Sequence, residues 1–241
     1  MPRSPLAGGA LRVLEPADAA YFGKAPRRDP ATPLRVTLTI RGWGVSLTWT
    51  EILGFATGAL CVWLVASQHI ANWPIGIANN VFFIVLFTQA KLYADAGLQV
   101  VFIALACYGW WTWARGGGPG RVLPVRRTSR VEWIWLLVSG AAGVAVLTVL
   151  LARMTDSNVP FWDALTTCLS LAATYGQCRK RLESWWLWIA ADLVYIPLYA
   201  YKELYLTAIL YVGFLTLCVL GLRGWRRDMA LAASAPAGAL K

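Results

Sequence analysis

A series of long apolar segments limits the possible folds of this chain more than any other feature. The hydrocarbon core of a bilayer is about 30 Å thick, so a helix that crosses it needs roughly 20 apolar residues. Segments of this kind recur along most of the 241 residues, of which 58% are hydrophobic, and the mean hydropathy is +0.54. The pattern predicts an all-α integral membrane protein with seven transmembrane helices. We expect these helices near residues 49–68, 72–89, 92–113, 131–152, 160–178, 185–201 and 203–223.

The segments between these runs suggest a division of the chain. The first residues are rich in Pro and Arg and contain no signal-peptide pattern, so we expect a loose tail there. The longest internal loop, "ARGGGPGRVLPVRRTSR", lacks the order of a phosphate-binding loop and is interpreted as a linker. The predicted parts are a flexible N-terminal tail (1–45), a first three-helix bundle (46–114), a basic loop with a linker helix (115–155), a second three-helix bundle (156–227) and a C-terminal tail (228–241).

The basic residues indicate how the chain is oriented. The net charge is +10, but Lys and Arg form short clusters between apolar runs, which favours topology signals over a nucleic-acid surface. The more basic side should be cytoplasmic, with the N-terminus outside and the C-terminus inside, although Lys24, Arg27 and Arg28 argue the other way. That side carries Arg115, Arg121, Arg126, Arg127, Arg130, Arg179, Lys180, Arg181, Arg223, Arg226 and Arg227. The opposite side carries Arg35, Arg41, Lys91, Arg153 and Lys202.

Residues with redox, metal-binding or catalytic chemistry are scarce. The five cysteines lie in or beside apolar segments and form no CxxC pair, and the single histidine, His69, has no second histidine in a ligand motif. No nucleophile is grouped with a base. The sequence therefore predicts a protein that is not an enzyme and holds neither a metal nor another cofactor.

The chain contains an internal repeat. A shift of 112 residues places the first three apolar segments on the last three without a gap, and it pairs Trp with Trp, Gly with Gly and polar with acidic residues. The pairs include Trp73 with Trp185, Asn80 with Asp192, Gly109 with Gly221 and Trp113 with Trp225. Because each half has three spans and one further span separates them, the halves enter the membrane from the same side. The expected architecture is 3+1+3, with parallel triple-helix repeats and a substrate site between them near the midplane.

The stretch "SWWLWIAADLVYIPLYAYKELY" holds the clearest candidates for that site. Trp185, Trp188 and Asp192 have the spacing of one helical face, and a carboxylate facing lipid would cost on the order of 3 kcal/mol or more. Asp192 should therefore point inward, and the aromatic face could stack on a flat ring or a cation. Trp185 and Trp186 could equally belong to an interfacial aromatic belt.

Polar residues of the other segments complete the candidate set. In the first half Asn79, Asn80 and Gln99 lie within spans, where each could bind a ligand or form a helix–helix hydrogen bond. The implied pocket is aromatic, amide-bearing and weakly acidic, which suits an uncharged or cationic ring with hydroxyl groups. The candidate substrate-binding residues are Trp188, Asp192, Trp185, Asn80, Gln99, Asn79, Trp73 and Tyr211.

Several stretches taken together resemble a known family. The WP, LYAD, YGWW, ATY and WxxWxxxD motifs, spread over residues 49–227, are similar to those of the PnuC-type vitamin transporters. The resemblance implies seven helices with SWEET-like repeats, usually a homotrimer, in the bacterial inner membrane. It also implies facilitated diffusion of nicotinamide riboside, with a cytoplasmic kinase that traps the product. By motif it assigns Trp185, Trp188 and Asp192 to the site, and by helix position Asn80 and Gln99.

Other functions stay open at this point. Relatives within the family are similar to thiamine or riboflavin carriers, and a carboxylate at Asp192 would suit a cationic thiazolium as well as a pyridinium. The chain could also be a membrane subunit that packs in a larger complex and transports nothing. Asp192 could in addition couple transport to a proton or Na⁺, but facilitated diffusion is the simpler hypothesis.

Overall fold

The computed structural model describes residues 35–40, 43–89, 93–116, 123–155, 157–201 and 205–234, in which seven α-helices follow one another. Their bounds lie close to the predicted segments. Within the described residues, three helices are long and apolar enough to cross a membrane: Tyr93–Arg115, Arg130–Met154 and Thr207–Ser234. The helices are α1 (Trp49–Ala66), α2 (Asn72–Gln89), α3 (Tyr93–Arg115), α4 (Arg130–Met154), α5 (Pro160–Cys178), α6 (Ser184–Tyr201) and α7 (Tyr205–Ser234).

Two features differ from the sequence-based expectations. An antiparallel hairpin of β1 (Arg35–Ile40) and β2 (Trp43–Thr48) precedes α1, in a segment expected to be mostly tail. Its strands are rich in Val, Thr, Leu and Ile, several of which fit a pleated strand better than a helix. At the other end, α7 continues to Ser234, into the expected C-terminal tail. Residues 1–34 and 235–241, which include the rest of both tails, lie outside the described residues.

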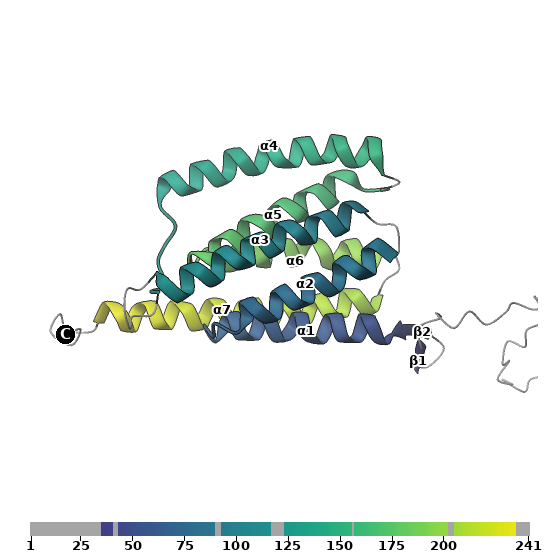
Figure 1. Cartoon of the computed structure of the whole chain (residues 1–241), viewed down its shortest axis with the longest axis horizontal. Coiled ribbons are helices and arrows are strands. Elements are labelled where there is room, and N and C mark those ends of the chain that lie inside the picture. The colour runs from purple at the N-terminus through teal and green to yellow at the C-terminus, as the bar shows by residue number, and fades with distance from the viewer. Residues whose placement is uncertain are drawn as a thin grey trace, which may run out of the picture.

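Successive helices run in opposite directions and form two groups joined by α4 (Figure 1). In the first group α2 packs against α1 and α3, and in the second α6 packs against α5 and α7. The groups meet where α1 contacts α7 and where α3 contacts α5. Helix α4 packs against α5, contains no buried residue, and lies apart from the other helices in Figure 1.

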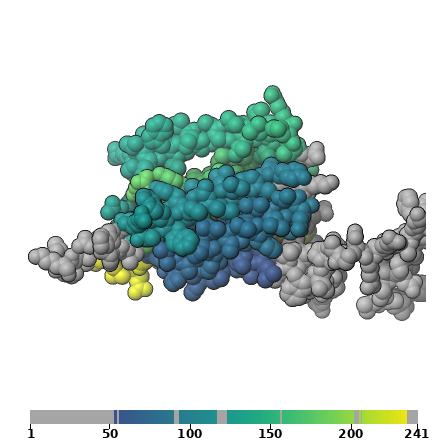
Figure 2. All heavy atoms as spheres, in the orientation of Figure 1, coloured from purple at the N-terminus to yellow at the C-terminus, as the bar shows by residue number. Residues whose placement is uncertain are grey.

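An apolar groove separates α4 from α5. It is lined by residues such as Leu137, Val144, Phe161 and Leu169, and Figure 2 shows an opening beneath α4 on the visible face. Large apolar side chains on α4 are exposed, among them Trp135 and Val146. In a membrane this surface would face hydrocarbon, so its exposure fits a lipid-embedded helix.

The interior of the two groups is built from tryptophans placed over glycines. Trp73 packs on Gly109 of its own group, and Trp185 packs on Gly221 in the same way. A methyl group at either glycine would overlap the indole ring above it. The members of these two contacts are 112 positions apart, so the repeat seen in the sequence is also a repeat of packing.

A second pair of contacts joins the groups at one end of the molecule. The indole N–H of Trp113 donates to the Gln177 carbonyl at 3.0 Å, and that of Trp225 donates to the Val65 carbonyl at 3.2 Å. The two bonds are again related by 112 positions, and each crosses from one group to the other. The Trp113 and Trp225 rings lie 6.3 Å apart.

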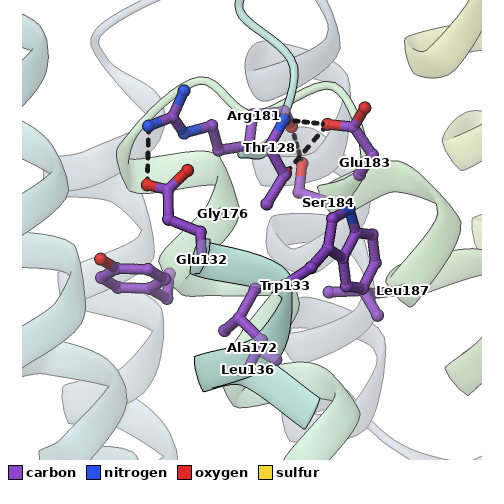
Figure 3. A pocket seen from close by; sticks show the side chains of 11 residues that line it. Thr128, Glu132, Trp133, Leu136, Ala172, Gly176, Arg181, Glu183, Ser184 and Leu187 are labelled. Atoms are coloured by element: carbon purple, nitrogen blue, oxygen red, sulfur yellow. Dashed lines mark hydrogen bonds and ion pairs between the residues drawn. The ribbon is translucent and has the colours of Figure 1, made fainter. Parts of the chain in front are cut away.

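The same end of the molecule holds the α5–α6 turn, the end of α3 and the start of α4, and we call it the basic end (Figure 1). Figure 3 shows the junction that fixes the start of α4 there. Arg181 pairs with Glu132 at 2.6 Å, and the Glu183 carboxylate accepts hydrogen bonds from the Thr128 amide and hydroxyl. A capping box between Ser129 and Glu132 starts the helix.

Candidate functional site

Helix α6 carries three polar atoms that are buried without a partner among the described residues, and two of them belong to Trp188 and Asp192. Asp192 is 3% exposed and its Oδ2 atom has no hydrogen-bond donor, and the indole Nε1 of Trp188 has no acceptor. The two residues are four positions apart, so they lie on one helical face. Buried polar groups in native proteins are nearly always satisfied, so an unpaired acceptor beside an unpaired donor indicates a place for a ligand or for water.

The neighbours of Asp192 come from α6 and α7. The Cys218 thiol hydrogen-bonds to the carboxylate, while Tyr195 and Tyr211 interact with it electrostatically. Cys218 is 3% exposed, so it is a buried neighbour of Asp192 and not a reactive surface thiol. The structure thus brings the predicted residues Trp188, Asp192 and Tyr211 into one region of the second group.

Tyrosine rings extend this region away from the basic end. The ring centroids of Tyr195 and Tyr211 are 4.7 Å apart, and those of Tyr199 and Tyr211 are 5.0 Å apart. The Tyr195 hydroxyl also hydrogen-bonds with the hydroxyl groups of Thr166 and Ser170 on α5. All three helices of the second group therefore contribute polar or aromatic side chains to one interior.

Two predicted site residues lie deeper in the packing. Trp185 is fully buried and contacts Trp225 edge to face at 5.4 Å, and Trp73 makes the same contact with Trp113 at 5.4 Å. The Nε1 atoms of Trp73 and Trp185 have no partner in the described part of the chain. These two rings therefore belong to the matched packing of the two groups. Their unpaired N–H groups lie at the edge of this packing.

The three amide candidates of the first group are half-buried on α2 and α3. The Asn79 side-chain oxygen accepts a hydrogen bond from the Thr57 hydroxyl at 2.7 Å, so this residue joins α2 to α1. Asn80 and Gln99 are placed on neighbouring helices, at the positions that correspond to Asp192 and Tyr211.

From the sequence Lys180 is expected only as a topology charge, but in the structure it is buried. Lys180 is 1% exposed, its ammonium donates to the Gln68 amide oxygen at 2.9 Å, and it lies 4.3 Å from the centre of the Trp113 ring. Burial lowers the pKa of Lys180 to about 8, and the nearby Asp228 carboxylate opposes this shift. Gln68 in turn donates to Asp228 at 2.6 Å.

The repeat could have revealed this contact. Gln68 and Lys180 are 112 positions apart and both have a positive φ, 53° and 48°, in the turns after α1 and α5. They are equivalent residues that meet each other where the two groups join. The 112-residue register is visible in the sequence, and pairing Lys180 with its repeat equivalent Gln68 is the signal that points to this contact.

The described residues contain no group of three or more His, Cys, Asp or Glu side chains that could hold a metal ion. Asp192 lies beside Cys218, but two such side chains are fewer than the three that a metal site needs. The chemistry available in this region is therefore hydrogen bonding, charge and aromatic stacking.

Comparisons with known proteins agree with this description. The family model described as nicotinamide mononucleotide transporter matches residues 48–227. The nicotinamide riboside transporter PnuC of Escherichia coli (strain K12) is 27% identical over 217 residues, which cover 79% of this chain and 90% of that protein. The riboflavin/roseoflavin transporter RibM of Streptomyces davaonensis is 30% identical over 192 residues, covering 76% and 88%.

A solved structure shares the fold. The crystal structure of the vitamin B3 transporter PnuC superimposes with a TM-score of 0.60 at 23% sequence identity, covering 76% of this chain and 83% of that one.

Proposed function

The chain belongs to the nicotinamide mononucleotide transporter family, and from this premise we propose that it takes up a vitamin precursor, most specifically nicotinamide riboside. The family consists of membrane transporters, so the chain is a transporter and not an enzyme. The observation that carries the proposal is the unpaired donor and acceptor of Trp188 and Asp192, one helical turn apart in an aromatic interior. The relatives named for nicotinamide riboside transport support the substrate.

The proposed architecture is seven membrane crossings in a 3+1+3 arrangement. Helices α1 to α3 and α5 to α7 are two parallel repeats related by a pseudo-twofold axis along the membrane normal. The matched tryptophan contacts and the two matched indole hydrogen bonds support this symmetry. Rocking of the repeats around a midplane site between them would move the substrate by facilitated diffusion.

In the proposed site, the substrate ring stacks on Trp188 and Tyr211, and its polar groups meet Asp192. Asn80 and Gln99 approach from the first repeat. The scaffold residues Trp185 and Trp73 border the site through their unpaired N–H groups, and Asn79 acts mainly through its bond to Thr57. The aromatic and polar side chains of this lining suit a planar ring that bears an amide and a ribose.

The riboside is a better candidate than the mononucleotide of the family's name. A phosphate would bring negative charge into an interior that already contains the Asp192 carboxylate. The described neighbours of Asp192 are a thiol and tyrosines, and no arginine is among them to bind a phosphate. Riboflavin is the second candidate, because the relative named for riboflavin and roseoflavin transport aligns with 76% of this chain. Thiamine is a weaker third.

We propose that the basic end faces the bacterial cytoplasm, which places the C-terminus inside. Lys and Arg cluster at this end, as the positive-inside rule requires. Arg121 of this set, and Arg41, Lys91 and Lys202 of the opposite set, lie outside the described residues. A cytoplasmic kinase would then trap the arriving riboside by phosphorylation. A homotrimer embedded in lipid is our expectation for the assembly, with the exposed apolar face of α4 in contact with lipid or a neighbouring copy.

Uptake of labelled nicotinamide riboside by cells that express Trp188→Ala tests the proposed site. We expect a loss of roughly fivefold to 150-fold, because stacking on one aromatic ring is worth about 1–3 kcal/mol. Trp186→Ala, which removes an exposed tryptophan of the same helix, is the matched control and should retain uptake. Unchanged uptake by Trp188→Ala at equal membrane expression would remove this residue from the site.

A further inference from the structure

The Asp192 carboxylate has no counterion in the described part of the protein. The ion pairs found there join Arg179 and Arg181 to Glu132 at the basic end. At Asp192 the contact is a thiol from Cys218, which is a weak hydrogen-bond donor, and Oδ2 is unpaired. An isolated carboxylate in an apolar interior is costly, so such a group must take up a proton or meet a cation.

Lys180, a second buried charged residue in the described part of the chain, is surrounded differently. Lys180 is equally buried, but its ammonium has the Gln68 amide oxygen, the face of Trp113 and the nearby Asp228 carboxylate. This set of partners comes from several elements of the fold. By contrast, the described surroundings of Asp192 supply aromatic rings and a thiol but no cationic side chain, so either a proton or a cation from outside the chain has to compensate its charge.

The fold itself does not require a charge at this position. The equivalent residue of the first repeat is Asn80, which has nearly the same shape as Asp192 and lies on the equivalent helix face. Two more differences accompany the charge, because Trp188 and Tyr211 occupy the positions of Gly76 and Gln99. A carboxylate flanked by aromatic faces therefore exists in one repeat only, and such a combination is suited to a cationic ring.

We infer that Asp192 is a specificity determinant that selects substrates whose ring carries a positive charge. The carboxylate compensates the charge of an N-substituted pyridinium, and the rings of Trp188 and Tyr211 bind its faces. This inference rests on the proposed function, because it describes the same site. It ranks the possible substrates: a cationic pyridinium riboside binds, while a neutral ring of the same size, or a neutral flavin, binds much more weakly.

Calorimetric titration of the purified full-length protein tests this with two ligands that differ by one hydride. Nicotinamide riboside is a cation, and its 1,4-dihydro form is neutral but keeps the amide and the ribose. We expect the wild type to bind the cation on the order of tenfold to a hundredfold more tightly, as for a charge-assisted contact. In Asp192→Asn the two affinities should approach each other. Asp95→Asn removes an exposed carboxylate at the start of α3 and should keep the wild-type ratio.

Each outcome has a defined meaning. Equal affinity of the wild type for both ligands would overturn the charge selection and leave the proposed function intact. A ratio that persists in Asp192→Asn would overturn the role of Asp192. Binding of riboflavin with no binding of either riboside would overturn both proposals, and the Asp192→Asn variant must elute as a folded species for its titration to count.

Discussion

The two three-helix groups share a scaffold but differ in chemistry. In both, a tryptophan of the second helix packs on a glycine of the third, and a later tryptophan of the third helix donates a hydrogen bond to the other group. The polar interior is not shared. The second group replaces the residues of the first at four equivalent positions: Gly76 by Trp188, Asn80 by Asp192, Gln99 by Tyr211 and Ala106 by Cys218.

The shared packing and the different polar residues have separate roles in the proposed transporter. In the proposed rocking mechanism, matched contacts would allow the two groups to pack and to move as equivalent bodies. A substrate that lacks twofold symmetry needs different groups on its two sides. In the proposed site, the first group would therefore offer small residues and amides, and the second would offer aromatic rings and a carboxylate.

Breaking the shared scaffold should have the largest effect. Gly109→Val and Gly221→Val each force a branched side chain into the space of an indole ring. Overpacking of this kind typically costs about 1–3 kcal/mol, and more where nothing can move. We expect both variants to lose monodisperse protein in size-exclusion chromatography and to unfold at lower temperature.

Gly97→Val on α3 and Gly213→Val on α7 are the matched controls, because nothing lies within 4 Å of a Cβ at either position. Normal behaviour of Gly221→Val would show that Trp185 can leave its place, and would contradict a rigid scaffold. If only one of the two scaffold glycines tolerated valine, the repeats would not be mechanically equivalent.

Moving the carboxylate from the second group to the first tests whether its position matters for substrate recognition. The double variant Asn80→Asp/Asp192→Asn keeps the charge but places it in the first group, away from Trp188 and Tyr211. We expect uptake of nicotinamide riboside to fall roughly tenfold, as in Asp192→Asn alone, because the position and not the total charge is recognised. Recovery of wild-type uptake in the double variant would mean that the two halves share the binding role equally.

Much of the scaffold could be predicted from the sequence, because apolar length and the Trp and Gly register report on helices and close packing. The seven helices and the placement of Asp192 in a buried interior are confirmed by the structure. The β1–β2 hairpin was missed, since short alternating segments give a weak signal beside long apolar runs. The burial of Lys180 was not predicted either, because a basic residue in a turn is normally exposed; the one signal for it was the 112-residue register, which pairs Lys180 with Gln68.

The pH dependence of the free energy of unfolding should show that the Lys180 ammonium is buried in the folded protein. Its pKa of about 8 lies below the ordinary value of 10.5, so the unfolded chain binds more protons between these two pH values. Stability should therefore rise as the pH increases from about 8 to 10.5, by about 1–3 kcal/mol for this group. Lys180→Met should lack this component, which is measured as the difference between the melting temperatures of the two proteins across the pH range. A difference that does not change with pH would contradict a charged, buried lysine.

The smallest effect is expected where the first group has a polar contact that the second lacks. Thr57 bonds to Asn79, whereas the equivalent residues are Leu169 and Ala191. Thr57→Leu removes this bond and should cost about 1 kcal/mol of stability without changing the KM for uptake. A raised KM at unchanged stability would place Asn79 in the substrate site instead.

Counterflow in proteoliposomes is the decisive experiment for carrier-mediated exchange of nicotinamide riboside. Vesicles that contain the purified protein are loaded with unlabelled nicotinamide riboside and diluted into labelled riboside, in the absence of any ion gradient. A facilitated-diffusion carrier predicts transient accumulation of label that is abolished in Trp188→Ala and is not seen when the vesicles are loaded with riboflavin or thiamine. Accumulation that requires an ion gradient, or that occurs only with another vitamin, would contradict the account.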